Sequence, residues 1–237
     1  MDTREHILSN VRSNQPTLRE LPQVPVFHRR AEPLVLAFER SLKYMAGEFA
    51  EHPPPDFSAY LHQKFPQAKN ICSAVPEYSG NKKPEDYSDW SDAADIDVTI
   101  VRSPLAVAET GSVLLTENEL RVNTIGFLAQ DIVILLDPKD IVENIHDAYQ
   151  HRAFRESKYA VLMTGPSGSA DIGGKTVHPA QGVMTLTVIM WPAAWSHCPR
   201  WRWVFKAAKH SATLSILRTF MPIQVSRWSA MVTALVH

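Results

Sequence analysis

Two serines, several glycines and one carboxylate gather in residues 164–176, directly after the short apolar run 159–163. Such a polar loop needs hydrogen-bond partners, and open α/β sheets bind ligands at the ends of buried strands, so this loop is the first candidate site. The candidate ligand-binding residues are Gly165, Ser167, Gly168 and Ser169. Asp171 is placed to accept from a ligand hydroxyl or to act as a base. The alternative is structural: a serine caps the following turn and Asp171 bonds nearby backbone.

The same loop comes close to two catalytic motifs but matches neither. The phosphate-binding motif GxxxxGK[ST] needs a glycine where the chain has Ser169, and Asp171 would repel a phosphate. The nucleophile motif GxSxG also needs a glycine at position 169, and Pro166 removes a backbone N–H. The sequence therefore argues against a nucleoside triphosphatase and gives a serine hydrolase little support.

A second candidate site is the segment Glu109-Thr110-Gly111-Ser112, which interrupts an apolar stretch. A glutamate at a kink between apolar strands is costly to bury unless it is paired or protonated, so Glu109 is a candidate nucleophile or general base. A solvent-facing strand residue fits the same pattern equally well. Thr110, Gly111 and Ser112 are candidate ligand-binding residues beside it.

Histidines provide the last candidates. His178 follows Asp171 closely enough to pair with it as an oriented base, although a lone histidine is more often a hydrogen-bonded structural residue. His146 and His151 lack the i, i+4 spacing that places two ligands on one helix face, so they do not indicate a zinc site. The sequence accordingly predicts no metal and no cofactor.

The segments that must position these residues alternate between helical and strand-like patterns, which predicts an α/β domain with a largely parallel central sheet. The expected helices span residues 2–14, 33–51, 57–64, 120–128 and 138–149, and the expected strands span residues 70–75, 95–101, 107–116, 131–136, 159–163 and 184–190. The run 131–136 is typical of a central strand, whereas the alternating run 95–101 indicates one exposed face. Thr110-Gly111-Ser112 should divide 107–116 into two short strands. We expect this kink and the loop after 159–163 to meet at one rim of the sheet.

Composition and charge exclude several classes of function. The chain has 237 residues, 45% of them hydrophobic, and a formal net charge of −1. From Trp191 onward it has six basic and no acidic residues, which leaves 18 basic against 25 acidic residues in the body and no reason to expect nucleic-acid binding. Two cysteines, Cys72 and Cys198, are too few for an iron–sulfur cluster or a disulfide framework. Without a signal-peptide core or an apolar run of about 18 residues, a cytoplasmic protein with no membrane span is expected.

The chain is expected to have three parts. These are an N-terminal amphipathic helix with a linker (1–25), an α/β domain (26–192) and a basic, tryptophan-containing tail (193–237). The tail differs abruptly in composition from the body. It is either an appended segment that docks on a partner or the product of a reading-frame change near the end of the gene, and the sequence leaves both open.

Several of these segments carry a resemblance to a known family. They are Ala108 to Ser112, Asp131 to Asp137, the segment GPSxSADI from Gly165 to Ile172, His178 with Gly182-Val183, and Leu186 to Ile189. Between about residues 70 and 190 the chain resembles the LUD domain, which defines the lactate-utilisation protein C (LutC/YkgG-type) family. Two positions depart from that pattern: Gly173 replaces a frequent acid, and Pro179 replaces the usual glycine after the histidine.

The resemblance implies a three-layer α/β sandwich like the NagB/RpiA/CoA transferase-like fold. It also implies a cluster-free subunit that acts with iron–sulfur partner proteins in oxidising L-lactate to pyruvate. The pocket candidates that it carries over are Glu109, Ser112, Ser167, Asp171 and His178. A small carboxylate ligand and a homo-oligomer are compatible with this role. Two alternatives remain: a stand-alone isomerase or acyl/CoA transferase using Glu109, and a regulatory module that binds a small acid.

Overall fold

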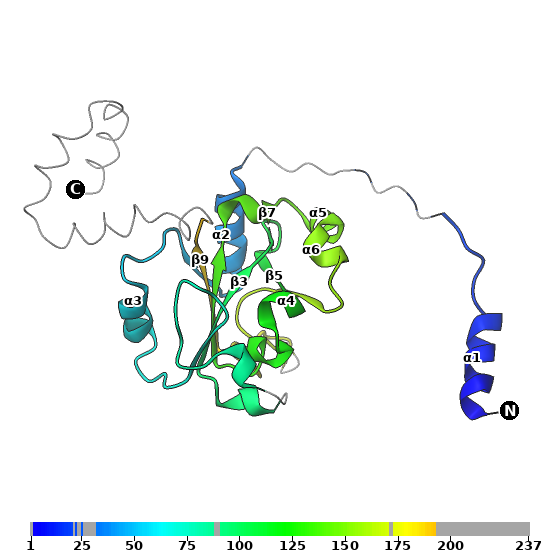
Figure 1. Cartoon of the computed structure of the whole chain (residues 1–237). Coiled ribbons are helices and arrows are strands. Elements are labelled where there is room, and N and C mark those ends of the chain that lie inside the picture. The colour runs from blue at the N-terminus through cyan, green and yellow to red at the C-terminus, as the bar shows by residue number, and fades with distance from the viewer. Residues whose placement is uncertain are drawn as a thin grey trace, which may run out of the picture. The chain divides into compact units, whose positions relative to one another are not determined.

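The computed structural model describes residues 2–20, 22, 25, 32–87, 91–170 and 173–192 (Figure 1). The chain divides into two units, Met1–Ala31 and Glu32–His237. In the first unit, helix α1 (Thr3–Ser13) confirms the expected N-terminal helix, and none of its residues is buried. The tail 193–237, with Cys198, and the candidate Asp171 lie outside the described residues.

A five-stranded parallel sheet, here sheet A, forms the centre of the second unit. Its strands are β1 (Glu48–Ala50), β2 (Ile71–Ser73), β3 (Val98–Ser103), β6 (Asp131–Leu136) and β9 (Thr185–Met190). Their order across the sheet is β1-β9-β6-β3-β2, and every neighbouring pair is parallel. The expected mixed α/β fold with a mostly parallel central sheet is confirmed.

Both faces of sheet A are buried, which explains the continuous apolar run of β6. Ile132, Ile134 and Leu136 belong to the cluster that includes Phe38 and Leu42 of helix α2 (Leu34–Tyr44). Val133 and Leu135 face the opposite way and pack with Phe57 and Leu61 of helix α3 (Phe57–Lys64). Figure 1 shows α3 apart from α2, with the sheet between them. Alternate residues of one strand therefore fill two separate layers of core.

A second, four-stranded sheet, here sheet B, has the order β7-β4-β5-β8. Its strands are β4 (Ala106–Val107), β5 (Ser112–Thr116), β7 (Ile141–Val142) and β8 (Ala160–Met163). β4 closely follows β3, and β7 closely follows β6. Two strands of sheet B are therefore connected directly to the carboxyl ends of two central strands of sheet A. Val107 and Leu114 of this sheet, with Leu105 just before β4, pack with α5 (Ile145–Gln150) and α6 (Arg152–Arg155).

The remaining elements are short. They are α4 (Glu117–Leu120) and the 3-10 helices η1 (Pro84–Asp86), η2 (Asp92–Asp95), η3 (Asn123–Gly126) and η4 (Pro138–Asp140). Among the residues that the structure describes, no helix is long and apolar enough to cross a bilayer.

Four expected elements were wrong in extent or character. The helix 33–51 ends at Tyr44 and is followed by β1, and the helix 120–128 is replaced by α4 and η3. In the region 138–149 a strand, β7, separates η4 from α5. The strand expected at 95–101 starts later, at Val98, and both of its faces are buried, because Val98 and Ile100 pack in the cluster of α3 and Val101 packs in the cluster of α2.

At the amino end of β6, Asp131 should make stability depend on pH. Burial raises the pKa of its carboxyl above the ordinary value, although the Thr185 hydroxyl donates to it at 2.5 Å. A raised pKa means that ionisation opposes folding, so this contribution to stability is present at low pH and is lost as pH rises through the folded pKa.

Replacing Asp131 by Asn should therefore raise Tm at pH 7 by about 1–2 °C, the shift produced by about 0.5 kcal/mol in a domain of this size. The amide oxygen can still accept from Thr185, and the difference should disappear near pH 3, where Asp131 is itself neutral. Thermal unfolding followed by circular dichroism at both pH values measures it. A larger stabilisation at pH 3 than at pH 7 would contradict the assignment.

Candidate functional site

The Glu109–Ser112 segment forms the turn that joins β4 to the antiparallel strand β5. Gly111 has a φ of +69°, a backbone conformation that glycine adopts without steric cost. A Cβ atom at this position would lie 2.3 Å from the backbone nitrogen of Leu42, so the turn lies directly against α2. The Ser41 hydroxyl also donates to the Glu109 carbonyl oxygen at 3.2 Å. The kink between the two apolar strands is thus held by contact with a helix from the beginning of the domain.

The start of the loop after β8 lies against the same helix. Gly165 has a φ of +64°, and a Cβ atom there would be 2.0 Å from the Met45 carbonyl oxygen. β8 pairs with β5, with Met163 opposite Val113, so Thr164 comes next to Ser112. Two segments far apart in sequence therefore converge on the last turn of α2.

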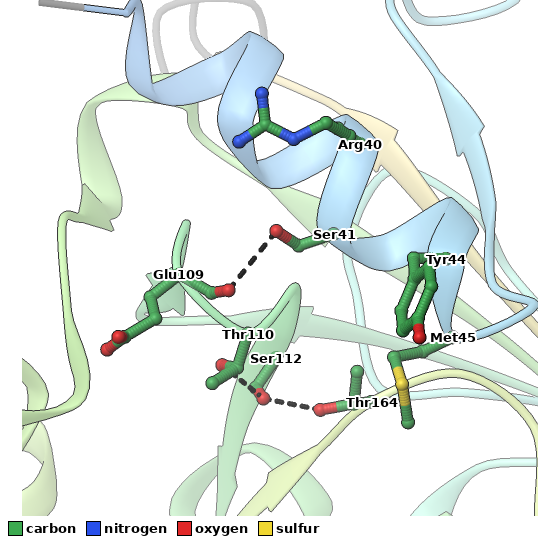
Figure 2. Close-up of a pocket in the computed structure, with 8 residues that line it drawn as sticks. All are labelled: Arg40, Ser41, Tyr44, Met45, Glu109, Thr110, Ser112 and Thr164. Atoms are coloured by element: carbon green, nitrogen blue, oxygen red, sulfur yellow. Dashed lines mark hydrogen bonds between the residues drawn. The ribbon is translucent and has the colours of Figure 1, made fainter. Parts of the chain in front are cut away.

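A pocket of about 490 Å³ lies where these segments meet (Figure 2). It is lined by Arg40, Ser41, Tyr44 and Met45 from the end of α2, by Glu109, Thr110 and Ser112 from the β4–β5 turn, and by Thr164. Tyr44 is 89% exposed and Met45 38% exposed at its rim. The volume lies in the range of small-molecule sites, about 300–1,000 Å³.

Three hydroxyl groups form a hydrogen-bonded chain in the wall of this pocket. The Thr110 and Ser112 oxygens are 2.7 Å apart, and the Ser112 oxygen bonds the Thr164 hydroxyl (Figure 2). Three hydroxyls carry three O–H donors, and the two bonds between them use two. One donor therefore remains, on whichever of the three hydroxyls does not donate to another, for an oxygen of a ligand. Reversing the bonds would move that donor from Thr110 to Thr164.

The pocket lining includes two charged residues, Arg40 and Glu109. The Arg40 guanidinium donates to both carboxylate oxygens of Glu32, at 2.5 and 2.7 Å, and this pair is exposed to solvent. The Glu109 carboxylate points away from the three hydroxyls in Figure 2 and accepts from the backbone N–H of Ile145 at 3.4 Å. In Figure 2 the Arg40 guanidinium also lies away from the three hydroxyls, beyond Ser41, so it is a cation at the outer part of the lining, whereas Glu109 is directed toward α5.

The remaining candidates lie farther along the loop and do not line this pocket. The Ser167 hydroxyl donates to the Gln181 carbonyl, and His178 Nδ1 lies 3.1 Å from the Ser167 carbonyl oxygen. A Cβ atom at Gly168 would be 2.5 Å from the His178 ring, so the imidazole packs on that glycine. The Ser169 backbone pairs with Val177 in an antiparallel bridge. These residues hold the two arms of the loop together, and the expected pairing of His178 with Asp171 falls partly outside the described residues.

Sequence reasoning missed the contribution of α2, namely Arg40, Ser41, Tyr44 and Met45. Tyr44 follows Arg40 by four residues, and Met45 follows Ser41 by four residues. This spacing places the residues on one face of a helix. An arginine and a tyrosine one helical turn apart are a local sequence signal that could have marked this face. Thr164 belongs to the glycine-rich loop but was not among its candidates.

Metal-binding side chains do not gather in the part of the chain that the structure describes: no group of three or more His, Cys, Asp or Glu residues there could hold an ion. Cys72 is fully buried in sheet A, and burial, with the negative charge of Asp86, raises the pKa of its thiol to about 12. A thiol in that environment stays protonated and unreactive at neutral pH.

Comparison with known proteins gives three matches. A sequence model of the LUD domain matches residues 16–190. "Lactate utilization protein C" of Geobacillus sp. (strain WCH70) is 26% identical over an alignment of 159 residues that covers 62% of this chain and 64% of that protein. The crystal structure of a DUF162 family protein from Deinococcus radiodurans superimposes with a TM-score of 0.50 and 14% identity, over 66% of this chain and 95% of that one. This chain therefore spans somewhat less than two thirds of the curated relative's length, and the structural likeness concerns the fold alone.

Proposed function

Because this chain belongs to the LUD-domain family, we propose that it acts in lactate utilisation, as a subunit that binds a small carboxylate in the pocket between α2 and the β4–β5 turn. The observation that carries the proposal is the match to a protein named for lactate utilisation over 62% of this chain. The chemistry of the pocket wall supports it, since hydroxyls and a cation line one hollow.

The residues of this pocket suit a hydroxy acid or its keto product. Arg40 can exchange its exposed partner Glu32 for a ligand carboxylate at little cost, since exposed ion pairs contribute only about 0–1 kcal/mol. The remaining donor of the Thr110–Ser112–Thr164 chain can bond the hydroxyl or carbonyl oxygen of the ligand. In this proposal the chain's own residues bind and orient the acid, and no redox step is assigned to them.

The electrons of lactate oxidation require an acceptor, and we propose that iron–sulfur partner proteins supply it. The chain has only two cysteines, and Cys72 is buried within a strand, so it lacks the four ligands that a cluster of its own would need. A division of labour, with the cluster in a partner and the acid-binding pocket here, accounts for both observations.

Thr164→Val tests the pocket assignment. Valine keeps the shape of threonine but removes the hydroxyl, so affinity for lactate or pyruvate should fall about tenfold, the effect of one lost hydrogen bond. Isothermal titration calorimetry on the full chain measures the affinity, and lactate-dependent dye reduction with the iron–sulfur partners measures the function. Ser58→Ala, at an exposed position of α3, is the matched control. The same affinity and the same dye reduction in Thr164→Val and wild type would reject the pocket.

A stand-alone isomerase or acyl/CoA transferase would use Glu109 as its base or nucleophile. The direction of the Glu109 carboxylate, toward Ile145 and away from the hydroxyl chain, favours the subunit over this alternative. Gel filtration and turnover assays with and without the partners separate the two. Turnover by the isolated chain that Glu109→Gln abolishes would support the stand-alone enzyme, and tight binding of an acid without turnover or partner would support a regulatory module.

A further inference from the structure

A second, smaller hollow lies at the carboxyl end of the edge strand β2. Its volume is about 140 Å³, and it shares no lining residue with the first pocket. Its wall includes Ser79, Gly80, Lys83 and Glu85 from the segment after β2, and Arg121 from the end of α4. The volume is well below the range of about 300–1,000 Å³ that is typical of drug-sized ligands, so any occupant has only a few atoms.

The segment that encloses this hollow is fixed by its own hydrogen bonds. The Ser73 hydroxyl donates to the Tyr78 carbonyl at 2.7 Å. The chain then returns beside β2, where Lys82 N–H donates to the Ile71 carbonyl and Ser73 N–H to the Lys82 carbonyl, both at 3.1 Å. A Cβ atom at Gly80 would lie 2.2 Å from the Ile71 carbonyl oxygen, so the backbone packs tightly there. The hollow is therefore built into the fold.

Arg121 has an unfavourable backbone conformation. Its φ is +60° and its ψ −51°, and Val122 N–H donates to the Leu120 carbonyl at 2.6 Å, which makes Arg121 the central residue of a γ-turn with positive φ. This form of γ-turn is rare and strained for any residue other than glycine. Strained residues cluster at ligand sites, where the surrounding structure holds them in place. An arginine rather than a glycine at this position points to a use for its side chain.

The charges around the hollow suit an anion. Lys83 and Arg121 contribute two positive charges to the lining, against one negative charge from Glu85. Glu85 Oε1 lies 3.4 Å from Arg121 Nη1, and both side chains are more than half exposed. An ion pair of this kind contributes little stability, so a stronger anion can displace the Glu85 carboxylate from the guanidinium.

From the confined volume, the two cations and the strained arginine, we infer that this hollow binds a small oxyanion, a free phosphate or the carboxylate of a short acid. Arg121 and Lys83 hold the anion, Ser79 is placed to add a hydroxyl donor, and Glu85 occupies the guanidinium when the site is empty. This inference is independent of the lactate assignment, because it rests on different residues and a different part of the sheet.

Titration of the full chain with inorganic phosphate, and separately with pyruvate, tests the site by isothermal titration calorimetry at constant ionic strength set with chloride. Arg121→Gly should weaken binding of the preferred anion at least tenfold, while its Tm stays equal to or above that of the wild type because glycine relieves the backbone. Lys83→Gln should also weaken binding. Glu85→Gln should tighten it several-fold, because the competing carboxylate is gone.

The directions of these changes in affinity and in Tm distinguish a binding site from a structural ion pair. A purely structural role for Arg121 predicts a lower Tm in both Arg121→Gly and Glu85→Gln and no anion binding to the wild type. Absence of saturable binding of either anion would overturn the inference, as would equal affinity of wild type, Arg121→Gly and Lys83→Gln. Loss of binding in Thr164→Val but not in Arg121→Gly would locate the anion in the first pocket instead.

Discussion

An alanine at position 111 should lower the free energy of unfolding by about 3–5 kcal/mol. Two costs add: the φ of +69° is unfavourable for any L-residue, and the new methyl group would lie 2.3 Å from the Leu42 backbone nitrogen and 2.6 Å from the Leu42 Cα. Both contacts are backbone atoms, which cannot rotate away as a flexible side chain would. Relief requires α2 to move off the β4–β5 turn, which would also open the pocket that they share. Urea unfolding followed by circular dichroism measures the change.

Gly173→Ala is the matched control for this substitution. Gly173 has nearly the same φ, +68°, but among the described residues no atom lies within 4 Å of a Cβ built there. Gly173→Ala should therefore lower the free energy of unfolding only by the cost of the backbone conformation, about 1 kcal/mol. If the two alanine variants were equally stable, close contact between α2 and the turn would not be the reason for a glycine at position 111.

Replacing Arg102 by Met should destabilise the fold by about 3 kcal/mol and lower Tm by about 6–12 °C. The Arg102 guanidinium pairs with Glu77, whose side chain is only 6% exposed, and it also donates to the Trp191 carbonyl oxygen at 3.1 Å. Without the arginine a nearly buried carboxylate loses its ion-pair partner. The estimate takes the low end of the range for broken buried pairs because Arg102 itself is 30% exposed.

A double-mutant cycle shows whether the pair is responsible. Glu77→Gln combined with Arg102→Met removes both charges and should recover most of the lost stability, measured as the midpoint of urea unfolding. Arg152→Met, at the fully exposed pair with Glu156, should leave that midpoint unchanged. If Arg102→Met behaved like Arg152→Met, the carboxyl end of β3 would not depend on this ion pair.

The central strands were predictable because their environment leaves a clear signature. Ile132–Leu136 is a continuous apolar run, and it occupies the middle of sheet A with both faces buried. The alternation of acidic and apolar residues from Asp95 to Asp97 wrongly indicated a strand with one exposed face, because both acids precede β3. Asp97 accepts from the N–H groups of Lys69 and Asn70, at 2.7 and 2.8 Å, and so its carboxylate closes the amino end of the sheet.

Two of the three helices that were wrong in extent, 33–51 and 138–149, show what a local pattern lacks. Helix α2 ends in a Schellman motif, in which Gly47 N–H bonds the Leu42 carbonyl and Ala46 N–H bonds the Lys43 carbonyl. The left-handed residue there is Ala46, with a φ of +62°, rather than the glycine that normally marks a helix end. Ile141 and Val142 have helical spacing, but pairing with β4 holds them extended, and that pairing depends on residues far away in the chain.

Three of the eight residues that line the candidate pocket followed from the sequence. Glu109, Thr110 and Ser112 were singled out because polar residues interrupt an apolar run, and all three line the pocket. The residues of α2 could not be found in this way, because only the close approach at Gly111 and Gly165 brings that helix to the turn. No sequence pattern marked Arg121. Its positive φ comes from the γ-turn between Leu120 and Val122, which the residue types of that segment do not favour.

The position of β1 in sheet A has a consequence for how the protein is made. β1 pairs only with β9, so that the register partners Glu48 and Thr187 lie 139 positions apart. A ribosome that adds about 5–20 residues per second needs roughly ten seconds to synthesise the intervening chain. Until β9 is available β1 has no strand neighbour, and once β6 has been made one of its edges keeps unpaired backbone N–H and C=O groups, so this half of sheet A can close only after Met190 has left the exit tunnel.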